Sequence, residues 1–201
     1  DRKELSDLGR SVPGHLKEVY LRIVEEPQVR SMLDEQNPSW RQAIAEDPGE
    51  DFKILQKKAG FNVSSTQQLS RLIFERYGVE FSNRWLTKKG GRSVEARVIK
   101  EIIKEQRRRD KDHPVLSFLE SVLEYKLLEK IITAYIKRIP SFTREDGTLQ
   151  VKYQITGTKS GRLSTTALGI HTIPKAGRSD IKKVFVSRWR DPRSEVNLAG
   201  S

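Results

Sequence analysis

Between residues 154 and 166 the chain reads Gln154-Ile155-Thr156-Gly157-Thr158-Lys159-Ser160-Gly161-Arg162-Leu163-Ser164-Thr165-Thr166. The two glycines allow tight backbone turns and the close approach of another molecule. The hydroxyl side chains are short donors that suit phosphate and sugar, and the planar fork of Arg162 suits a phosphate or a base edge. These residues indicate a loop that contacts a polyanion, with an ordinary solvated turn as the open alternative. The candidate contacts are Thr158, Lys159, Arg162, Ser164 and Thr165.

Charge is unevenly distributed along the chain. The 201 residues include 38 lysines and arginines and 27 acids, which gives a formal net charge of +11. Residues 88–109 hold nine lysines and arginines against three glutamates, and residues 151–190 hold nine against one aspartate. Two basic segments on a mildly acidic remainder favour a bound polyanion over a general role in solubility.

Other features of the composition narrow the class of protein. The sequence has no cysteine and therefore no disulfide or thiolate metal site, and its three histidines lack ligand spacing. Its apolar runs fall short of the ~20 residues that cross a bilayer. We therefore expect a cytoplasmic protein, from a bacterium or a phage-infected cell. Because the chain starts at Asp1, we also expect a piece of a longer protein.

Apolar spacing predicts a mainly helical chain in which strands appear late. Residues 1–14 are expected to be a flexible start, and Pro27 is expected to kink or divide the helix that follows. Ser93 is predicted to cap the helix that begins just after it in the chain. Asp146-Gly147 is predicted to form a hairpin turn. The other expected elements are a helix over 52–59 ended by Gly60, a helix after the hydroxyls of 64–66 that ends at Gly78, a helix from Pro114 to residue 139, and a strand over 149–155.

The order of residues within 154–166 carries a family resemblance. Residues 156–165, followed by Ile173-Pro174, resemble the T-x-T-x-x-G-R-L-S-S…N-I-P segment of family A DNA polymerases, the bacterial DNA polymerase I-like enzymes. Segments 61–78, 88–93, 113–140 and 181–186 also resemble that family, in the right order. The match is weaker over the first sixty residues.

The resemblance implies an architecture. It implies an α+β fold, mainly α, with a helical thumb of long antiparallel helices followed by the first antiparallel strands of a palm subdomain. The implied division is a helical lead-in over residues 1–60, a thumb over 61–140 and an incomplete palm over 141–201.

The resemblance also implies contacts with a primer-template duplex. In the family, the segment matched by residues 156–165 touches the duplex near the growing end, and a glycine-containing loop at the place of 88–93 lies along the minor groove. The implied DNA-binding residues outside residues 154–166 are Lys88, Lys89, Arg92, Ser93, Lys126, His171 and Thr172. His171 and Thr172 replace the family's Gln and Asn, and Lys126 replaces an arginine. A solvated, charged helix face is the alternative for the basic residues of 88–109.

The sequence offers no catalytic residue and no metal ligand of its own. Phosphoryl transfer of this kind needs carboxylates that hold two metal ions, and Mg²⁺ is expected for the assembled polymerase. In the family, the first such carboxylate directly follows a strand, which here would be residues 196–199, and the chain ends at Ser201. Either the carboxylate is the next residue of a missing partner, or Ser201 stands in its place. We therefore expect a second chain, or a C-terminal continuation, to supply the palm and fingers.

Two functions remain open. The first is part of a DNA-directed DNA polymerase that grips primer-template DNA and is inactive as an isolated chain, either as a natural split polymerase or as a truncated one. The second is a non-catalytic nucleic-acid-binding module with polymerase-like architecture. They differ in whether a partner with the missing carboxylates exists.

Overall fold

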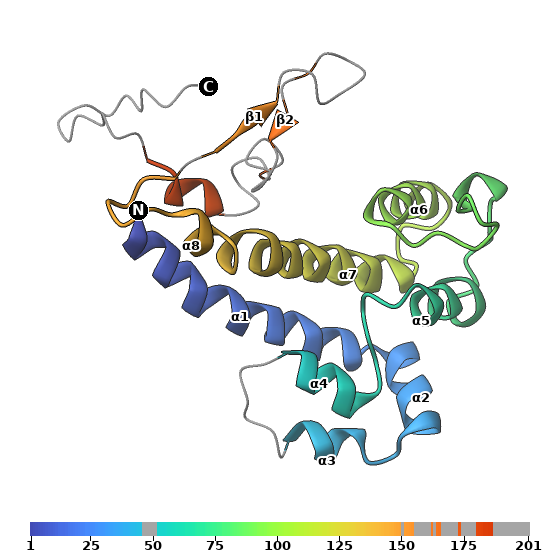
Figure 1. Ribbon diagram of the computed structural model, residues 1–201. Helices are drawn as coiled ribbons and strands as arrows, with labels where there is room; N and C mark the ends of the chain where they lie inside the picture. Colours follow the sequence, from blue (N-terminus) through green and yellow to red (C-terminus); the bar gives the residue numbers. More distant parts are fainter. Residues whose placement is uncertain are drawn as a thin grey trace. The chain divides into compact units, whose positions relative to one another are not determined.

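The computed structural model describes residues 1–45, 52–149, 151–154, 162, 164–165, 173 and 180–186. These residues form helices and one two-stranded antiparallel sheet (Figure 1). The expected α+β, mainly α, class is therefore confirmed.

The chain divides into two compact units. Unit 1 comprises Asp1–Val12 and Lys130–Ser201, and unit 2 comprises Pro13–Glu129. The expected division at residues 60 and 140 stays a prediction.

The first helix, α1 (Arg2–Val24), corrects the expectation of a flexible start. The Asp1 carboxylate accepts hydrogen bonds from the backbone N–H groups of Lys3 and Glu4, at 2.9 and 3.3 Å. It therefore satisfies donors that a helix N-terminus otherwise leaves unpaired. The expected division at Pro27 is confirmed, because α1 ends at Val24 and α2 (Pro27–Gln36) begins at the proline.

Unit 2 continues with α3 (Trp40–Ala45), α4 (Phe52–Ala59), α5 (Thr66–Ser70) and the π-helical η1 (Arg71–Arg76). Two local predictions are confirmed here. Gly60 follows α4 with φ +80°, and its N–H donates to the Gln56 carbonyl at 3.0 Å. Ser65 caps α5 by accepting from the Gln68 N–H.

The core of unit 2 includes a buried polar arrangement around two tyrosines. Tyr20 and Tyr125 pack with ring centroids 6.3 Å apart. The Tyr20 hydroxyl donates to the Phe61 carbonyl at 2.9 Å, and the Gln56 side-chain amide donates to the Tyr125 hydroxyl. Burial raises the pKa of both tyrosines, so both stay neutral.

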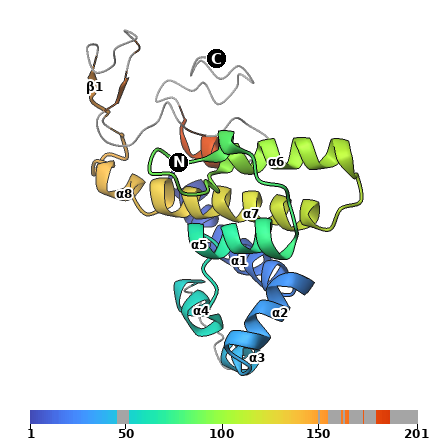
Figure 2. The ribbon, with the colours of Figure 1, turned by 90° about the vertical axis from the view of Figure 1, so that its right-hand side faces the viewer.

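After the short 3-10 helix η2 (Asn83–Trp85), unit 2 holds α6 (Ala96–Arg109) and most of α7 (Val115–Lys130), which lie near each other in Figure 2. The His113 ring nitrogen Nδ1 accepts from the Val115 N–H at 3.2 Å at the start of α7. The expected helix from Pro114 to residue 139 is confirmed as far as Ile136, where the continuous helical run ends three residues early. The π-helical η3 (Ile131–Ile136) follows α7, and α8 (Ile139–Phe142) restarts with Pro140, which cannot continue an α-helix because it has no N–H.

Unit 1 contains the sheet. The predicted turn at Asp146-Gly147 is confirmed, since Gly147 has φ +81° and Arg144 N–H donates to the Thr148 carbonyl at 2.9 Å. Strand β1 (Tyr153–Gln154) pairs antiparallel with β2 (Ser164–Thr165), in the register Tyr153 to Thr165. The strand expected over 149–155 is thus two residues long where the structure describes it. The 3-10 helix η5 (Asp180–Val184) buries Ile181 and Val184.

Candidate nucleic-acid interface

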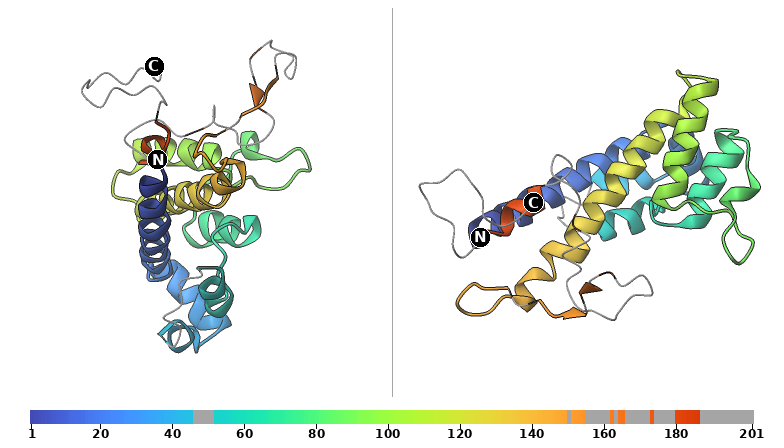
Figure 3. Two further views of the ribbon diagram at one scale, coloured as in Figure 1. Left: turned by 60° about the vertical axis from the view of Figure 1, so that its left-hand side comes forward. Right: turned by 90° about the horizontal axis from the view of Figure 1, so that it is seen from above.

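The basic turn predicted around Lys88 is a tight hairpin over residues 85–93, here called the tip hairpin. Its sides meet through a bridge between Leu86 and Arg92, and the Thr87 N–H donates to the Gly91 carbonyl at 2.7 Å. A turn closes between Thr87 and Gly90, whose φ is +79°. The right-hand view of Figure 3 shows the connection between α5 and α6 ending in a projecting loop.

Lys88 and Lys89 occupy the two central positions of this turn, and both are exposed. Neither makes an ion pair within the described part of the chain. Two unneutralised ammonium groups on a projecting turn suit a polyanion, because each can replace a counterion at a phosphate.

The base of the tip hairpin is fixed by an aromatic cluster. Trp85 is 2% exposed, and its ring centroid lies 6.2 Å from those of both Phe74 and Phe81. Phe74 and Phe81 meet edge to face at 5.1 Å. The Arg92 guanidinium lies 5.5 Å from each of these phenylalanine rings, and its Nη1 lies 3.3 Å from a Glu75 carboxylate oxygen.

Ser93 differs from its prediction as a helix cap. It is buried, and its hydroxyl accepts from the Glu95 N–H at 3.4 Å. The N-cap of α6 is Glu95, which makes no side-chain capping bond. Ser93 lies two residues before the cap, too early to reach the first free N–H groups of the helix. Its role as a DNA contact stays a prediction.

One face of α6 carries five exposed cations, which we call the cationic face of α6. Residues three and four apart along a helix share a face, and this spacing groups Arg97, Lys100, Lys104, Arg107 and Arg108. Arg97 pairs with Glu101 of its own helix, and Arg107 pairs with Glu120 of α7. Within the described residues, Lys100, Lys104 and Arg108 make no ion pair.

Arginines elsewhere in unit 2 are mostly neutralised by carboxylates. Arg41 pairs with Asp34 at 2.9 Å, and Arg22 pairs with Glu124 at 3.1 Å. Arg84, Arg76 and Arg109 have similar partners in Glu105, Glu35 and Glu80. On the cationic face of α6, by contrast, Lys100, Lys104 and Arg108 have no carboxylate partner among the described residues. The sequence prediction did not include Lys100, Lys104 or Arg108 as contacts, although their four-residue spacing was visible.

Lys126 lies on α7 and is partly buried. Burial holds its pKa below the usual range, while nearby Glu129 and Glu95 act in the opposite direction. It lies farther from solvent than the lysines of the tip hairpin, and its predicted contact with DNA stays a prediction.

The glycine- and hydroxyl-rich stretch of residues 154–166 is described only in part. Arg162 is exposed, and Ser164 and Thr165 form β2 with intermediate exposure. The Ser164 hydroxyl donates to the Gln154 carbonyl across the sheet at 3.4 Å. Thr158, Lys159, His171 and Thr172 lie outside the described residues. Three of the predicted contacts of this stretch, Arg162, Ser164 and Thr165, thus lie within the described residues.

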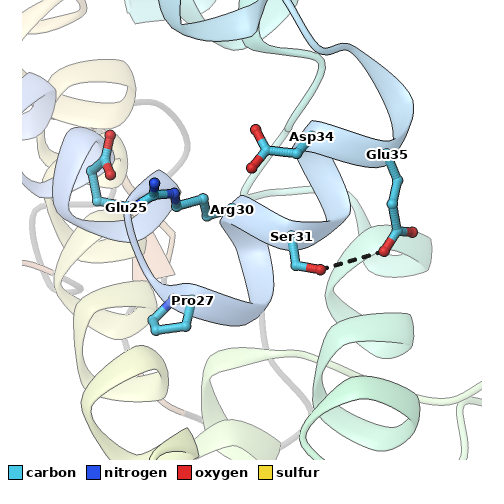
Figure 4. Close-up of a pocket in the computed structure, with 6 residues that line it drawn as sticks. All are labelled: Glu25, Pro27, Arg30, Ser31, Asp34 and Glu35. Carbon is cyan, nitrogen blue, oxygen red and sulfur yellow. Dashed lines mark hydrogen bonds between the residues drawn. The ribbon is translucent and has the colours of Figure 1, made fainter.

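An open pocket beside α2 collects acidic side chains (Figure 4). Its lining includes Glu25, Arg30, Ser31, Asp34 and Glu35. Asp34 and Glu35 are engaged by Arg41 and Arg76, whose hydrogen bonds lower the pKa of each carboxyl. These carboxylates serve ion pairs and are not directed at a common point.

The described residues do not fit a two-metal centre. Among them, no three histidine, cysteine or acidic side chains gather as a metal ion would require. Over the same residues, no helix combines the length and apolar character that a membrane span needs. We therefore assign no step of a metal-dependent reaction to the described residues.

Comparison with known proteins gives a consistent family. The family model described as DNA polymerase family A matches residues 30–193. The chain is 30% identical over 147 residues to DNA polymerase I of Chloroflexus aurantiacus, covering 69% of this chain and 14% of that protein. It is 29% identical over 134 residues to DNA polymerase I of Streptococcus pneumoniae, covering 65% of this chain and 14% of that protein.

A thermostable relative extends the comparison. The thermostable DNA polymerase I of Thermus aquaticus is 31% identical over 115 residues, which cover 57% of this chain and 12% of the relative. The chain thus spans about one seventh of the length of the relatives it matches.

Proposed function

This chain belongs to DNA polymerase family A, and on that premise we propose that it forms the thumb and the first part of the palm of a DNA-directed DNA polymerase. In this proposal, residues 61–140 are the thumb and residues 141–201 begin the palm. The chain would hold primer-template DNA during template-directed nucleotide addition in replication or repair. The relatives are named DNA polymerase I, which supports a DNA substrate for the complete protein.

The observation that carries the proposal is the unneutralised charge of the tip hairpin and α6. Lys88 and Lys89 on the hairpin, and Lys100, Lys104 and Arg108 on α6, are exposed and make no ion pair within the described residues. Phosphate contacts of this kind bind duplex DNA without regard to sequence, as a polymerase requires.

A second part of the proposal concerns the region around β2. Arg162 would contact the duplex near the primer end, with Ser164 and Thr165 on the adjoining strand as hydrogen-bonding neighbours. Thr158, Lys159, His171 and Thr172 are proposed contacts from the same stretch, and Lys126 and Ser93 are proposed contacts from the thumb. The support is the family match, which covers all these positions.

Catalysis is proposed to need residues outside those described here. Family A polymerases use Mg²⁺, which in a polymerase activates the attacking hydroxyl and stabilises the leaving group. We propose that a second chain, or a continuation of this one, supplies the acidic ligands. The assembled enzyme is proposed to work in the cytoplasm.

Binding measurements on two DNA probes test the proposal. One probe is a blunt duplex, and the other has the same sequence with a recessed primer end. We expect the full chain to bind the recessed end more tightly than the blunt duplex. Arg162→Gln should reduce this difference in affinity by roughly tenfold, which is the effect of one good bidentate arginine contact. Lys3→Gln removes the same charge from an exposed position of α1 and should leave the preference intact. Equal losses on both probes would refute the primer-end role.

A primer-extension assay tests the missing chemistry. The isolated chain, with Mg²⁺ and all four nucleotides, should add no nucleotide to the primer. Extension by the pure chain would contradict the proposal that the catalytic carboxylates lie elsewhere.

The alternative function is a non-catalytic nucleic-acid-binding module, favoured by the absence of an acidic cluster among the described residues. Capture of stoichiometric partners from the native cell distinguishes the two. A partner that restores primer extension supports the polymerase, whereas DNA binding without any such partner supports the module.

A further inference from the structure

Arg92 lies where the tip hairpin rejoins the rest of unit 2, and its surroundings differ from those of Lys88 and Lys89. Its guanidinium carbon is 5.5 Å from the ring centroids of both Phe74 and Phe81. Its Nη1 is 3.3 Å from Glu75 Oε1, and its side chain is 42% exposed. The guanidinium is thus held by three groups, whereas the two lysines make no ion pair within the described chain.

We propose that Arg92 is a positioning residue, which holds the tip hairpin in place so that Lys88 and Lys89 meet the DNA backbone. This inference rests on the proposed function. It assigns Arg92 a different role from the direct DNA contact that the sequence predicts. To reach a phosphate, the guanidinium would have to leave two aromatic rings and a carboxylate that it already contacts.

The opposite side of the hairpin supports this role. Trp85 closes the base of the hairpin through its carbonyl, which accepts from the Ser93 N–H at 2.7 Å. The Trp85 ring packs on the same two phenylalanines that hold Arg92. Both sides of the hairpin therefore end on one aromatic pair, which orders the intervening turn.

Ordering the turn before DNA arrives affects affinity. A flexible hairpin would lose conformational entropy on binding, and a hairpin that is already ordered avoids that loss. Arg92 should therefore raise DNA affinity without adding a phosphate contact. Log affinity falls linearly with log salt concentration, and we call the magnitude of this gradient the salt slope. A direct contact by Arg92 would instead add about 0.9 to the salt slope.

Salt titrations separate these two roles. The probe is a fluorescein-labelled 20-base-pair duplex of arbitrary sequence, bound by the full chain. Lys88→Gln and Lys89→Gln should each lower the salt slope by about 0.9. Arg92→Gln should weaken binding by up to about tenfold at every salt concentration with an unchanged slope. Arg22→Gln, which removes an equally charged arginine paired with Glu124, should change neither.

A substitution at Glu75 gives a result of opposite sign under the two roles. Glu75→Gln makes the chain more positive, so a direct contact by Arg92 predicts tighter binding and a steeper slope. The positioning role predicts weaker binding, because Arg92 loses one of its three holding groups. Glu124→Gln adds the same charge away from the hairpin and controls for the change in net charge.

Two further measurements keep the test independent of global folding. Trypsin should cleave after Lys88 and Lys89 faster in Arg92→Gln than in the wild type, with unchanged cleavage at other sites. Arg92→Lys keeps the charge but loses the planar fork, so it should resemble Arg92→Gln in affinity and in cleavage.

The outcomes distinguish this inference from the proposed function. A slope lowered by about 0.9 in Arg92→Gln, together with tighter binding by Glu75→Gln, would overturn the positioning role and leave the DNA interface intact. Unchanged slopes in both lysine variants would remove the tip hairpin from the DNA interface, and the inference would be refuted with it.

Discussion

Joint replacement of Lys100 and Lys104 by glutamine tests whether the cationic face of α6 contacts DNA. The two lysines lie one helical turn apart, are exposed and make no ion pair within the described part of the chain. Glutamine has nearly the same helix propensity as lysine, so α6 should persist. Like charges four residues apart repel, so the double variant should be more stable by about 0.2–0.5 kcal/mol.

The expected loss of DNA binding follows from the number of phosphate contacts. Each neutralised phosphate contributes about 0.9 to the salt slope, so removal of two contacts should lower the slope by about 1.8. Between 50 and 200 mM salt, the affinity of the wild type should then fall about twelvefold more than that of the variant. Fluorescence anisotropy with a 20-base-pair duplex, measured across this salt range, gives both slopes.

A matched control distinguishes position from net charge. Arg22→Gln combined with Arg41→Gln removes the same two charges, but each of these arginines has a carboxylate partner. We expect its salt slope to equal that of the wild type. An unchanged slope in the Lys100 and Lys104 variant, or an equal change in both double variants, would refute the argument that unneutralised charge marks the interface.

Three further substitutions test the packing, turn and ion-pair assignments. Tyr125→Phe removes the acceptor of the buried Gln56 amide and should cost about 1–3 kcal/mol in urea unfolding; an unchanged midpoint would contradict that bond. Gly90→Ala places a side chain at φ +79° and should cost the hairpin about 1–2 kcal/mol, seen as faster trypsin cleavage after the preceding lysines. Gly14→Ala, which lies within α1 and meets open space, should raise the melting temperature instead. The arginine partner of Glu35 lowers the pKa of its carboxyl, so the stabilisation it gives is present above pH 4.5 and is lost as the pH falls further. Glu35→Gln should therefore reduce the loss of unfolding free energy at acid pH. Identical plots of unfolding free energy against pH for the variant and the wild type would exclude the effect.

Local features were predicted correctly because their causes lie within a few residues. Gly60 ends α4 because only glycine adopts a positive φ easily, and Pro27 starts a new helix because it lacks an N–H. The Asp146-Gly147 turn has the same local origin. The family resemblance was also visible from motif order alone, and it is confirmed by the match over residues 30–193.

The mistaken predictions concern the exact geometry of helix ends. Residues 1–14 contain a proline and two glycines, yet the Asp1 carboxylate caps a helix that passes through all three. Ser93 has the right side chain for a cap but lies two residues before the N-cap position, which Glu95 occupies. In both cases the outcome depends on which N–H a side chain reaches, which residue type alone does not specify.

Composition and motif order predict the family, the mainly helical class and the concentration of charge in residues 88–109, because they are properties of the chain alone. Which of those charges lack a carboxylate partner depends on how the chain folds. Arg92 meets Glu75 seventeen positions away, and Arg107 meets Glu120 of another helix, whereas Lys100 and Lys104 meet no carboxylate among the described residues. Neutralisation requires two groups to come within a few ångströms, and only folding brings residues from separate helices that close.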